Sequence, residues 1–290
     1  MRRIPLAPYL LLAPGFLLLV AFTHYPAVLA FWQSLFTTPR GRRPAQWAGA
    51  DNYAAMLSDP VLAKVLWNSA LYAAATVPAS IVLAFLMALW VNGRMPGRAF
   101  ARLAFFTPTI LPMVAAANIW LFFYTPGFGL LDRVLAGAFG LPSTNWLGSD
   151  ATALWAVVVV AVWKEAGFFM IFYLAAFQAV PPALAEAARL EGCGRWRYVR
   201  RVLIPLVAPT TLFVAVNALI NAFRVVDHIF AMTGGGPNNA TNLLLFHIWE
   251  TGFRFWDTAQ ASALTVLLLA ILAVAAAVQF RLMDRRTHYR

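Results

Sequence analysis

Long apolar stretches separated by short polar segments dominate the pattern of this chain. Crossing the roughly 30 Å hydrocarbon core of a bilayer takes about 20 predominantly apolar residues. Six stretches are long enough, and the prolines within them are compatible with bundled membrane helices, whose neighbours satisfy the freed backbone groups. The predicted spans are residues 9–31, 66–91, 103–124, 151–177, 203–223 and 259–283. The pattern predicts an all-α integral membrane protein with one transmembrane domain over residues 1–290.

Composition agrees with a chain that lies mostly in lipid. Hydrophobic residues make up 62% of the sequence and charged residues 11%, against about 25% charged residues in soluble domains. Little length remains for a separate soluble domain. The single cysteine, Cys193, excludes an intramolecular disulfide. The first apolar stretch could also be a secretory signal with Val28 and Ala30 in cleavage-like positions, but its length favours a retained helix.

The net charge of +11 is explained by membrane topology rather than by nucleic acid. Arginine and lysine are enriched in short cytoplasmic loops. Assigning alternate loops to the two sides places fourteen basic residues on one side and six on the other, which predicts that both termini are cytoplasmic. The fourteen are Arg2, Arg3, Arg94, Arg98, Arg102, Arg189, Arg195, Arg197, Arg200, Arg201, Arg281, Arg285, Arg286 and Arg290; the six are Arg40, Arg42, Arg43, Lys64, Arg133 and Arg254.

The second cytoplasmic loop, residues 181–202, has the composition of two short helices joined by a turn. Pro181 and Pro182 interrupt the preceding span, and strong helix formers follow them. Gly192 and Gly194 permit a tight change of direction before the chain returns to the membrane. Such a loop could fit a groove on another protein, or it could be a basic connector against lipid headgroups. Composition alone leaves both interpretations open.

The spacing within this loop resembles the EAA motif of permeases in ATP-binding-cassette (ABC) importers. That motif reads E-A-A, three residues, G, nine residues, then I-x-L-P. Here Glu186, Ala187 and Ala188 are followed by three residues and Gly192, then by nine residues and the segment Val-Leu-Ile-Pro at 202–205. The two aliphatic positions carry conservative replacements. The segment TGGGPNNATN at residues 233–242 and the basic C-terminus extend the resemblance, which is greatest to the carbohydrate and glycerol-3-phosphate permeases.

The resemblance implies a six-helix, non-catalytic permease in a prokaryotic inner membrane. Its expected partners are a second permease, two cytoplasmic ABC ATPases, an extracytoplasmic solute-binding protein and membrane lipid, with no nucleic acid. MgATP would be bound by the ATPases and no cofactor by this chain. The cargo would be a sugar or a glycerol-3-phosphate-like solute. The residues expected to couple the chain to the ATPases are Glu186, Ala187, Ala188, Glu191, Gly192 and Pro205.

Charged residues within spans are costly, which makes them candidates for function. Lys164 and Glu165 lie near the middle of the fourth apolar stretch. Asn217, Asn221 and Arg224 recur at spacings of four and three, so they share one face of the fifth predicted span. Both groups could line a substrate passage. The alternatives are structural pairing for Lys164 and Glu165, and interhelical hydrogen bonding for the second group, with Arg224 reaching the membrane surface.

Other functional classes have less support. Lys64 and Lys164 follow alanine and tryptophan rather than the glycine of a Walker A motif, so an ATPase would have to be a separate subunit. The four histidines are dispersed without a catalytic or metal-binding spacing. An ion-coupled secondary transporter using Lys164, Glu165 and Arg224 is the main alternative, although no broken-helix ion site is evident.

Overall fold

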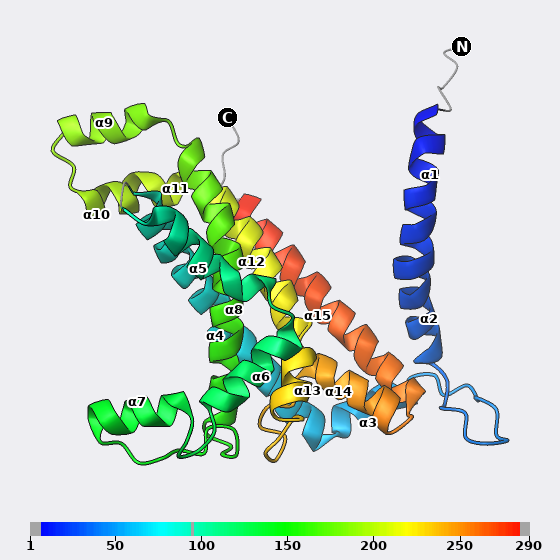
Figure 1. Cartoon of the computed structure of the whole chain (residues 1–290). Helices are drawn as coiled ribbons and strands as arrows, with labels where there is room; N and C mark the ends of the chain where they lie inside the picture. Colours follow the sequence, from blue (N-terminus) through cyan, green and yellow to red (C-terminus); the bar gives the residue numbers. More distant parts are fainter. Residues whose placement is uncertain (1–6, 94–95, 285–290) are drawn as a thin grey trace, which may run out of the picture. The chain divides into compact units, whose positions relative to one another are not determined.

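The computed structural model describes residues 7–93 and 96–284, and this part of the chain is helical (Figure 1), with strand pairing limited to two isolated β-bridges. Arg2, Arg3, Arg94, Arg285, Arg286 and Arg290, which contribute to the predicted charge asymmetry, lie outside the described residues. The elements are α1 (Ala7–Leu19), the π-helical turn η1 (Val20–His24), α2 (Tyr25–Gln33), α3 (Asp51–Ser58), α4 (Pro60–Asn92), α5 (Arg98–Ile110), α6 (Met113–Phe123), α7 (Leu130–Phe139), α8 (Ala153–Ala179), α9 (Pro182–Leu190), α10 (Arg195–Tyr198), the π-helical turn η2 (Val199–Leu203), α11 (Ile204–Leu206), α12 (Ala208–Phe223), α13 (Asp227–Met232), α14 (Leu244–Trp249), the π-helical turn η3 (Glu250–Arg254) and α15 (Thr258–Asp284).

Four continuous helices are long and apolar enough to cross a membrane. They cover Tyr9–Gln33, Pro60–Asn92, Ala153–Ala179 and Thr258–Gln279. Two further pairs of helices meet the same criteria only as bent pairs, Arg98–Ile110 with Met113–Phe123 and Arg195–Leu206 with Ala208–Phe223. The prediction of an all-helical membrane protein is confirmed, and each predicted span falls on one of these helices or helix pairs.

The third predicted span, residues 103–124, is not one straight helix. α5 and α6 meet at 103°. Leu111 at the break is extended, with φ −66° and ψ 137°, because a residue that precedes proline is disfavoured in the helical region. Pro112 then precedes the second helix as its N-cap residue, and it lacks the N–H that would continue the first helix. The break leaves the last carbonyl groups of α5 without partners inside that helix.

The fifth predicted span, residues 203–223, is also broken. A helical segment, Arg195–Leu206, precedes it and meets α12 at 69°. Val207 separates the two with φ −94° and ψ 9°, and Pro209 lies in the first turn of α12. Proline is well tolerated in a first helical turn, where its missing N–H has no helical partner to lose. α12 therefore carries most of the predicted span, and the preceding segment turns away from its axis.

The chain divides into two compact units, one comprising Met1–Ala63 with His247–Ile271 and the other Lys64–Phe246 with Leu272–Arg290. In the first unit, the apolar window of Tyr9–Gln33 buries none of its residues. Asp257 organises the polar part of this unit, because its carboxylate accepts a 2.6 Å hydrogen bond from Thr38 Oγ1. Thr38 Oγ1 in turn accepts from the Ala259 backbone N–H at 2.9 Å. These contacts join the segment after α2 to the start of α15.

α8 is central to the second unit. Phe169, Met170 and Tyr173 are buried in one apolar core. The helix also packs closely on α5, because a Cβ on Gly167 would overlap the Phe105 carbonyl oxygen. Glycine is required here for close approach of the two backbones. α9 and α10 lie beyond one end of α8, and α6 and α7 lie toward the other (Figure 1).

Hydrogen bonds to the Asp132 carboxylate fix the loops around α7 in the second unit. Asp132 accepts hydrogen bonds from the Gly127 N–H at 2.8 Å, Ser143 Oγ at 2.5 Å and Trp146 Nε1 at 2.8 Å. The Ser143 hydrogen bond contributes most to lowering the pKa of Asp132 to about 2, because these donors favour the ionised carboxylate.

The segment 233–242 folds as an irregular loop, as its glycine and asparagine content predicts. Asn238 and Asn239 have positive φ angles of 44° and 58°, a region in which asparagine is enriched. Lys64 Nζ donates to the Asn238 carbonyl at 2.6 Å, and Asn68 Nδ2 donates to the Asn239 carbonyl at 2.7 Å. Lys64 and Asn68 therefore hold this loop to α4.

Candidate functional site

The glycine of the EAA segment ends α9 through a specific backbone geometry. Gly192 has φ +69°, and its N–H donates to the Arg189 carbonyl at 3.0 Å. The next N–H, on Cys193, donates to the Ala188 carbonyl at 2.8 Å. This pair of bonds is a Schellman motif, which favours glycine at its left-handed position. The spacing from Ala188 to Gly192 is thus the spacing required to close the helix and turn the chain.

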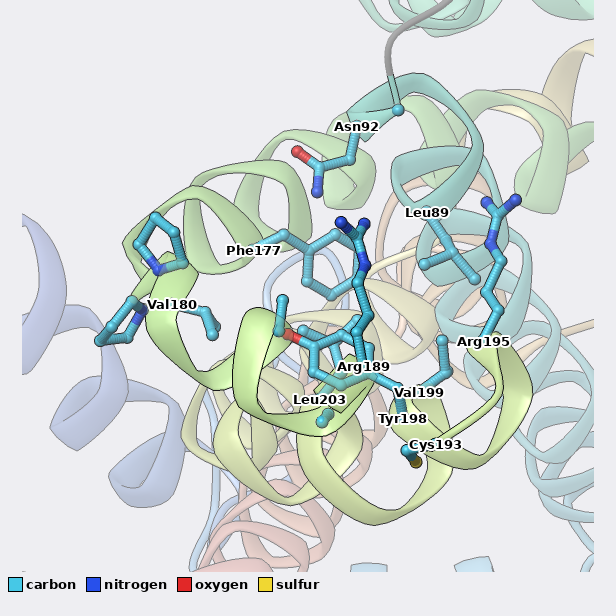
Figure 2. Close-up of a pocket in the computed structure, with 15 residues that line it drawn as sticks. Leu89, Asn92, Phe177, Val180, Arg189, Cys193, Arg195, Tyr198, Val199 and Leu203 are labelled. Atoms are coloured by element: carbon cyan, nitrogen blue, oxygen red, sulfur yellow. The ribbon is translucent and has the colours of Figure 1, made fainter. Parts of the chain in front are cut away.

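α9 presents two different faces. Ala185, Ala188 and Arg189 line a cavity of about 550 Å³ that the loop shares with the ends of α4 and α8. Figure 2 shows this cavity, with the Arg189 side chain extending from the loop toward Asn92 at the end of α4. Small side chains on this face leave space beneath the helix rather than filling it.

The opposite face of α9 is exposed and has no partner within the described chain. Glu186 and Ala187 are exposed, and Leu190 is 90% exposed. Glu186 and Glu191 form no ion pair with any residue that the structure describes. Pro205 lies apart from this surface, in α11, where it is exposed. Ala187 and Leu190 thus form an exposed apolar surface next to the unpaired Glu186 carboxylate. A surface of this kind is suited to contact with another protein.

A second, polar cavity lies beside α8 and the end of α12. It has a volume of about 270 Å³. Four of the five predicted passage residues line it, which brings Asn221 and Arg224 of the α12 end to the same cavity as Lys164 and Glu165. The full lining is Met113, Ala161, Lys164, Glu165, Asn221, Arg224, Val225, Val226, Asp227 and His228. Residues about 60 positions apart in the sequence thus meet at one site, which the spacing along each helix does not predict.

Asn217 does not line this cavity. Its side-chain amide donates to the Phe213 carbonyl at 2.7 Å, four residues earlier on the same helix. Asn217 shares a helical face with Asn221 in the sequence pattern, but it lies one turn away from the cavity and satisfies its amide locally. The structure gives Asn217 a local role in α12 rather than a contact with Glu165 or Arg224.

The Lys164 ammonium group is bound by the break between α5 and α6. Its Nζ donates to the carbonyl oxygens of Pro108 at 3.3 Å, Thr109 at 3.2 Å and Leu111 at 2.5 Å. The Thr109 hydroxyl returns a bond to the Lys164 carbonyl at 3.1 Å. Lysine carries three N–H donors, and all three carbonyls come from the end of α5. Lys164 is therefore a cap for the broken helix as well as part of the cavity wall.

We expect Lys164→Met to lower the free energy of unfolding by about 1–3 kcal/mol, the usual cost of leaving a polar group inside the protein without its partner. The α5–α6 break would also lose its tie to α8. The measurement is the thermal unfolding midpoint of the purified protein. Lys64→Met, which removes one bond to an exposed loop, is the matched control. Equal unfolding midpoints for the two variants would contradict the capping role.

Sequence reasoning missed Asp227, His228 and Met113 as neighbours of this cavity. His228 is 3% exposed, and its Nε2 lies 3.1 Å from the Tyr72 hydroxyl. Burial lowers the pKa of His228 to about 3, which keeps the ring neutral near pH 7. The available signal was the cluster of polar side chains in the segment RVVDH at 224–228. The break after α12 brings this segment to the cavity, and a straight-helix pattern does not predict that turn.

No group of three or more histidine, cysteine, aspartate or glutamate side chains within residues 7–93 and 96–284 could hold a metal ion.

The two cavities differ in chemistry. The cavity under α9 has a mainly apolar wall beside two arginines, and the cavity beside α8 gathers cationic, anionic and amide groups. The second therefore has the kinds of side chain that bind a polar solute.

Comparison with known families identifies the chain. Residues 64–289 match the family described as "Binding-protein-dependent transport system inner membrane component". The chain is 33% identical over 285 residues to the sn-glycerol-3-phosphate transport system permease protein UgpA of Agrobacterium fabrum (strain C58), covering 97% of this chain and 96% of the relative. It is 31% identical over 286 residues to UgpA of Salmonella typhimurium (strain LT2), covering 97% and 95%.

Solved structures show the same fold. A bacterial ABC transporter involved in the import of the acidic polysaccharide alginate matches with a TM-score of 0.85 and 22% identity, over 97% of this chain and 96% of that chain. The alginate transporter in complex with an alginate pentasaccharide-bound periplasmic protein matches with a TM-score of 0.83 and 21% identity, over 96% and 94%. The chain therefore belongs to the family of binding-protein-dependent transport system inner membrane components, and it is a multi-pass, non-catalytic permease component of an ABC importer.

Proposed function

We propose that this chain forms half of the translocation pathway for a sugar or a glycerol-3-phosphate-like solute, and that α9 couples that pathway to ATP hydrolysis in partner subunits. The exposed face of α9 is the observation that carries the proposal. Glu186, Ala187 and Leu190 form a small surface with one unpaired carboxylate at the end of a helix with defined termini. A groove on an ATPase that offers an apolar wall and a cation would be complementary to it.

The partners follow from this surface and from the family. We propose two ABC ATPases that bind MgATP, a second permease that supplies the other half of the passage, and an extracytoplasmic binding protein that delivers the solute. The six spans would act as one transmembrane domain with both termini in the cytoplasm. In this arrangement α9 lies on the ATP side of the membrane, and its motion is transmitted through the ends of α8 and α12. An allosteric link of this kind requires two arrangements that differ in affinity for nucleotide or solute.

The substrate passage is proposed at the cavity beside α8. Lys164, Glu165 and Arg224 are its charged residues from the predicted set, and none of them forms an ion pair with a described residue. The Lys164 ammonium group is already bound to backbone carbonyls, which leaves Glu165 and Arg224 to contact a solute. A carboxylate accepts hydrogen bonds from hydroxyl groups, and a guanidinium donates to hydroxyl, carboxylate or phosphate oxygens. These groups suit a polyhydroxylated solute, with or without an anionic substituent. The similarity to glycerol-3-phosphate permeases and to the alginate transporter supports the same class of cargo.

We expect Glu165→Gln and Arg224→Gln each to reduce uptake at low solute concentration by roughly tenfold or more, which corresponds to the loss of one charge-assisted hydrogen bond. Assembly with the partner subunits should persist, because neither side chain forms an ion pair with a described residue. The measurement is KM and maximal rate of ATP-driven uptake, with co-purification of the subunits as the assembly check. Arg133→Gln, at an exposed position of α7, is the control. Unchanged kinetics in both cavity variants would remove these residues from the passage.

A further inference from the structure

A hollow on the cytoplasmic loop gathers four arginines. It has a volume of about 560 Å³. The four guanidinium groups form no ion pair with any carboxylate in the described part of the chain. Like charges placed this close repel one another unless an anion neutralises them. We call this feature the basic hollow, and it is lined by Gly192, Gly194, Arg195, Trp196, Arg197, Arg200 and Arg201.

The helical segment that carries the basic hollow lies across the end of a span. Arg195–Leu206 meets α12 at 69°. Val199 and Leu203 bury one face of the segment in the core of the second unit, at 2% and 5% exposure. Figure 1 shows α10 and α11 nearer to the spanning helices than α9 is. The segment that carries the arginines leads directly into α12, whereas α9 is separated from it by the turn at residues 191–194.

Exposed apolar residues accompany these charges. Trp196 is 68% exposed, and Ile204 and Leu206 are 45% and 48% exposed. A tryptophan, several arginines and outward-facing aliphatic residues on one short segment are typical of helices at the membrane interface, where rings and cations meet headgroups. An acidic protein surface would neutralise the arginines but would leave these apolar side chains without lipid to contact.

We propose that the basic hollow binds the phosphate group of an anionic phospholipid of the inner leaflet. Guanidinium groups hold phosphate oxygens in bidentate hydrogen bonds, and several cations near the surface attract anionic headgroups. The loop then has two surfaces with different partners. α9 docks on the ATPase, and the Arg195–Leu206 segment rests on lipid, which gives the coupling loop a fixed support at the membrane.

The test uses the assembled transporter, purified and placed in nanodiscs of phosphatidylcholine with or without phosphatidylglycerol. Native mass spectrometry measures the affinity for retained phosphatidylglycerol. Each arginine is expected to contribute about fivefold, so Arg197→Gln with Arg201→Gln should weaken binding by roughly 25-fold. Arg197→Lys with Arg201→Lys should lose less binding than the glutamine pair, because the charge remains, but more than wild type, because the bidentate hydrogen bonds are lost. Arg98→Gln, at an exposed cytoplasmic position of α5 outside the hollow, should have little effect.

Several outcomes would overturn the proposal. An equal loss of phosphatidylglycerol in Arg98→Gln would mean diffuse surface charge rather than a site. Unchanged lipid retention with loss of the ATPase subunits in the double glutamine variant would assign the arginines to the ATPase. Displacement of the lipid by inorganic phosphate at similar concentration would indicate a site for a free anion. Retained phosphatidylglycerol that depends on Arg197 and Arg201, and that phosphate does not displace, is the result expected from the structure.

Discussion

Glu186→Lys is expected to reduce ATP-driven uptake by at least about tenfold, because reversing a charge at a complementary interface costs several kcal/mol. Glu186 is exposed and takes part in no described ion pair, so the substitution should leave folding and membrane insertion intact. The loss should come from weaker binding of the ATPase subunits. Co-purification of those subunits with a tagged permease measures this directly, alongside uptake in proteoliposomes.

The control for Glu186→Lys is a charge reversal on the opposite predicted side of the membrane. Asp51 is exposed at the start of α3, where a cytoplasmic ATPase could not reach it. Asp51→Lys should leave the amount of co-purified ATPase unchanged. If Glu186→Lys retained wild-type ATPase binding and uptake in a correctly assembled transporter, α9 would not be the coupling element.

Gly167→Ala is expected to disturb the packing of α5 against α8 in the membrane domain. The added Cβ would overlap the Phe105 carbonyl oxygen, so α5 and α8 would have to separate, and overpacking of this kind costs typically about 1–3 kcal/mol. The same separation would pull the α5–α6 break away from Lys164. We expect a lower unfolding midpoint and less monodisperse protein after extraction into detergent.

Gly137→Ala provides a matched control for this substitution. Gly137 lies within α7, and a Cβ there would meet nothing within 4 Å. Alanine has the higher helix propensity by about 1 kcal/mol, so Gly137→Ala should be neutral or slightly stabilising. Equal midpoints for Gly167→Ala and Gly137→Ala would show that α5 and α8 do not require close contact at this position.

Much of the fold could be predicted because the relevant signals are local. A run of apolar residues long enough to span a bilayer identifies a transmembrane helix wherever it packs. The position of Gly192 is equally local, since the Schellman motif that closes α9 involves only residues within five positions of it. Spacing along one helix also indicated that Asn221 and Arg224 share a face, and both line the same cavity.

The remaining features depend on contacts between distant segments. Proline at position 112 indicates a possible kink, but it gives neither the 103° bend between α5 and α6 nor the partner of the freed carbonyls. That partner is Lys164, more than 50 residues away. Asp227 and His228 reach the cavity only because the chain turns after α12. The spacing along α12 grouped Asn217 with Asn221. Only the packing of α8 against α12 shows that Asn221 lines the cavity and that Asn217 does not.

ATP-driven uptake into sealed proteoliposomes that contain the complete transporter tests the central claim most directly. The assay uses the cognate binding protein with labelled sn-glycerol-3-phosphate and labelled sugars as probes, and it varies ATP and ion gradients separately. We predict that uptake requires hydrolysable ATP on the α9 side of the membrane and continues after all ion gradients are collapsed. Uptake that persists with a non-hydrolysable ATP analogue and stops when an ion gradient is collapsed would contradict this account and indicate an ion-coupled secondary transporter.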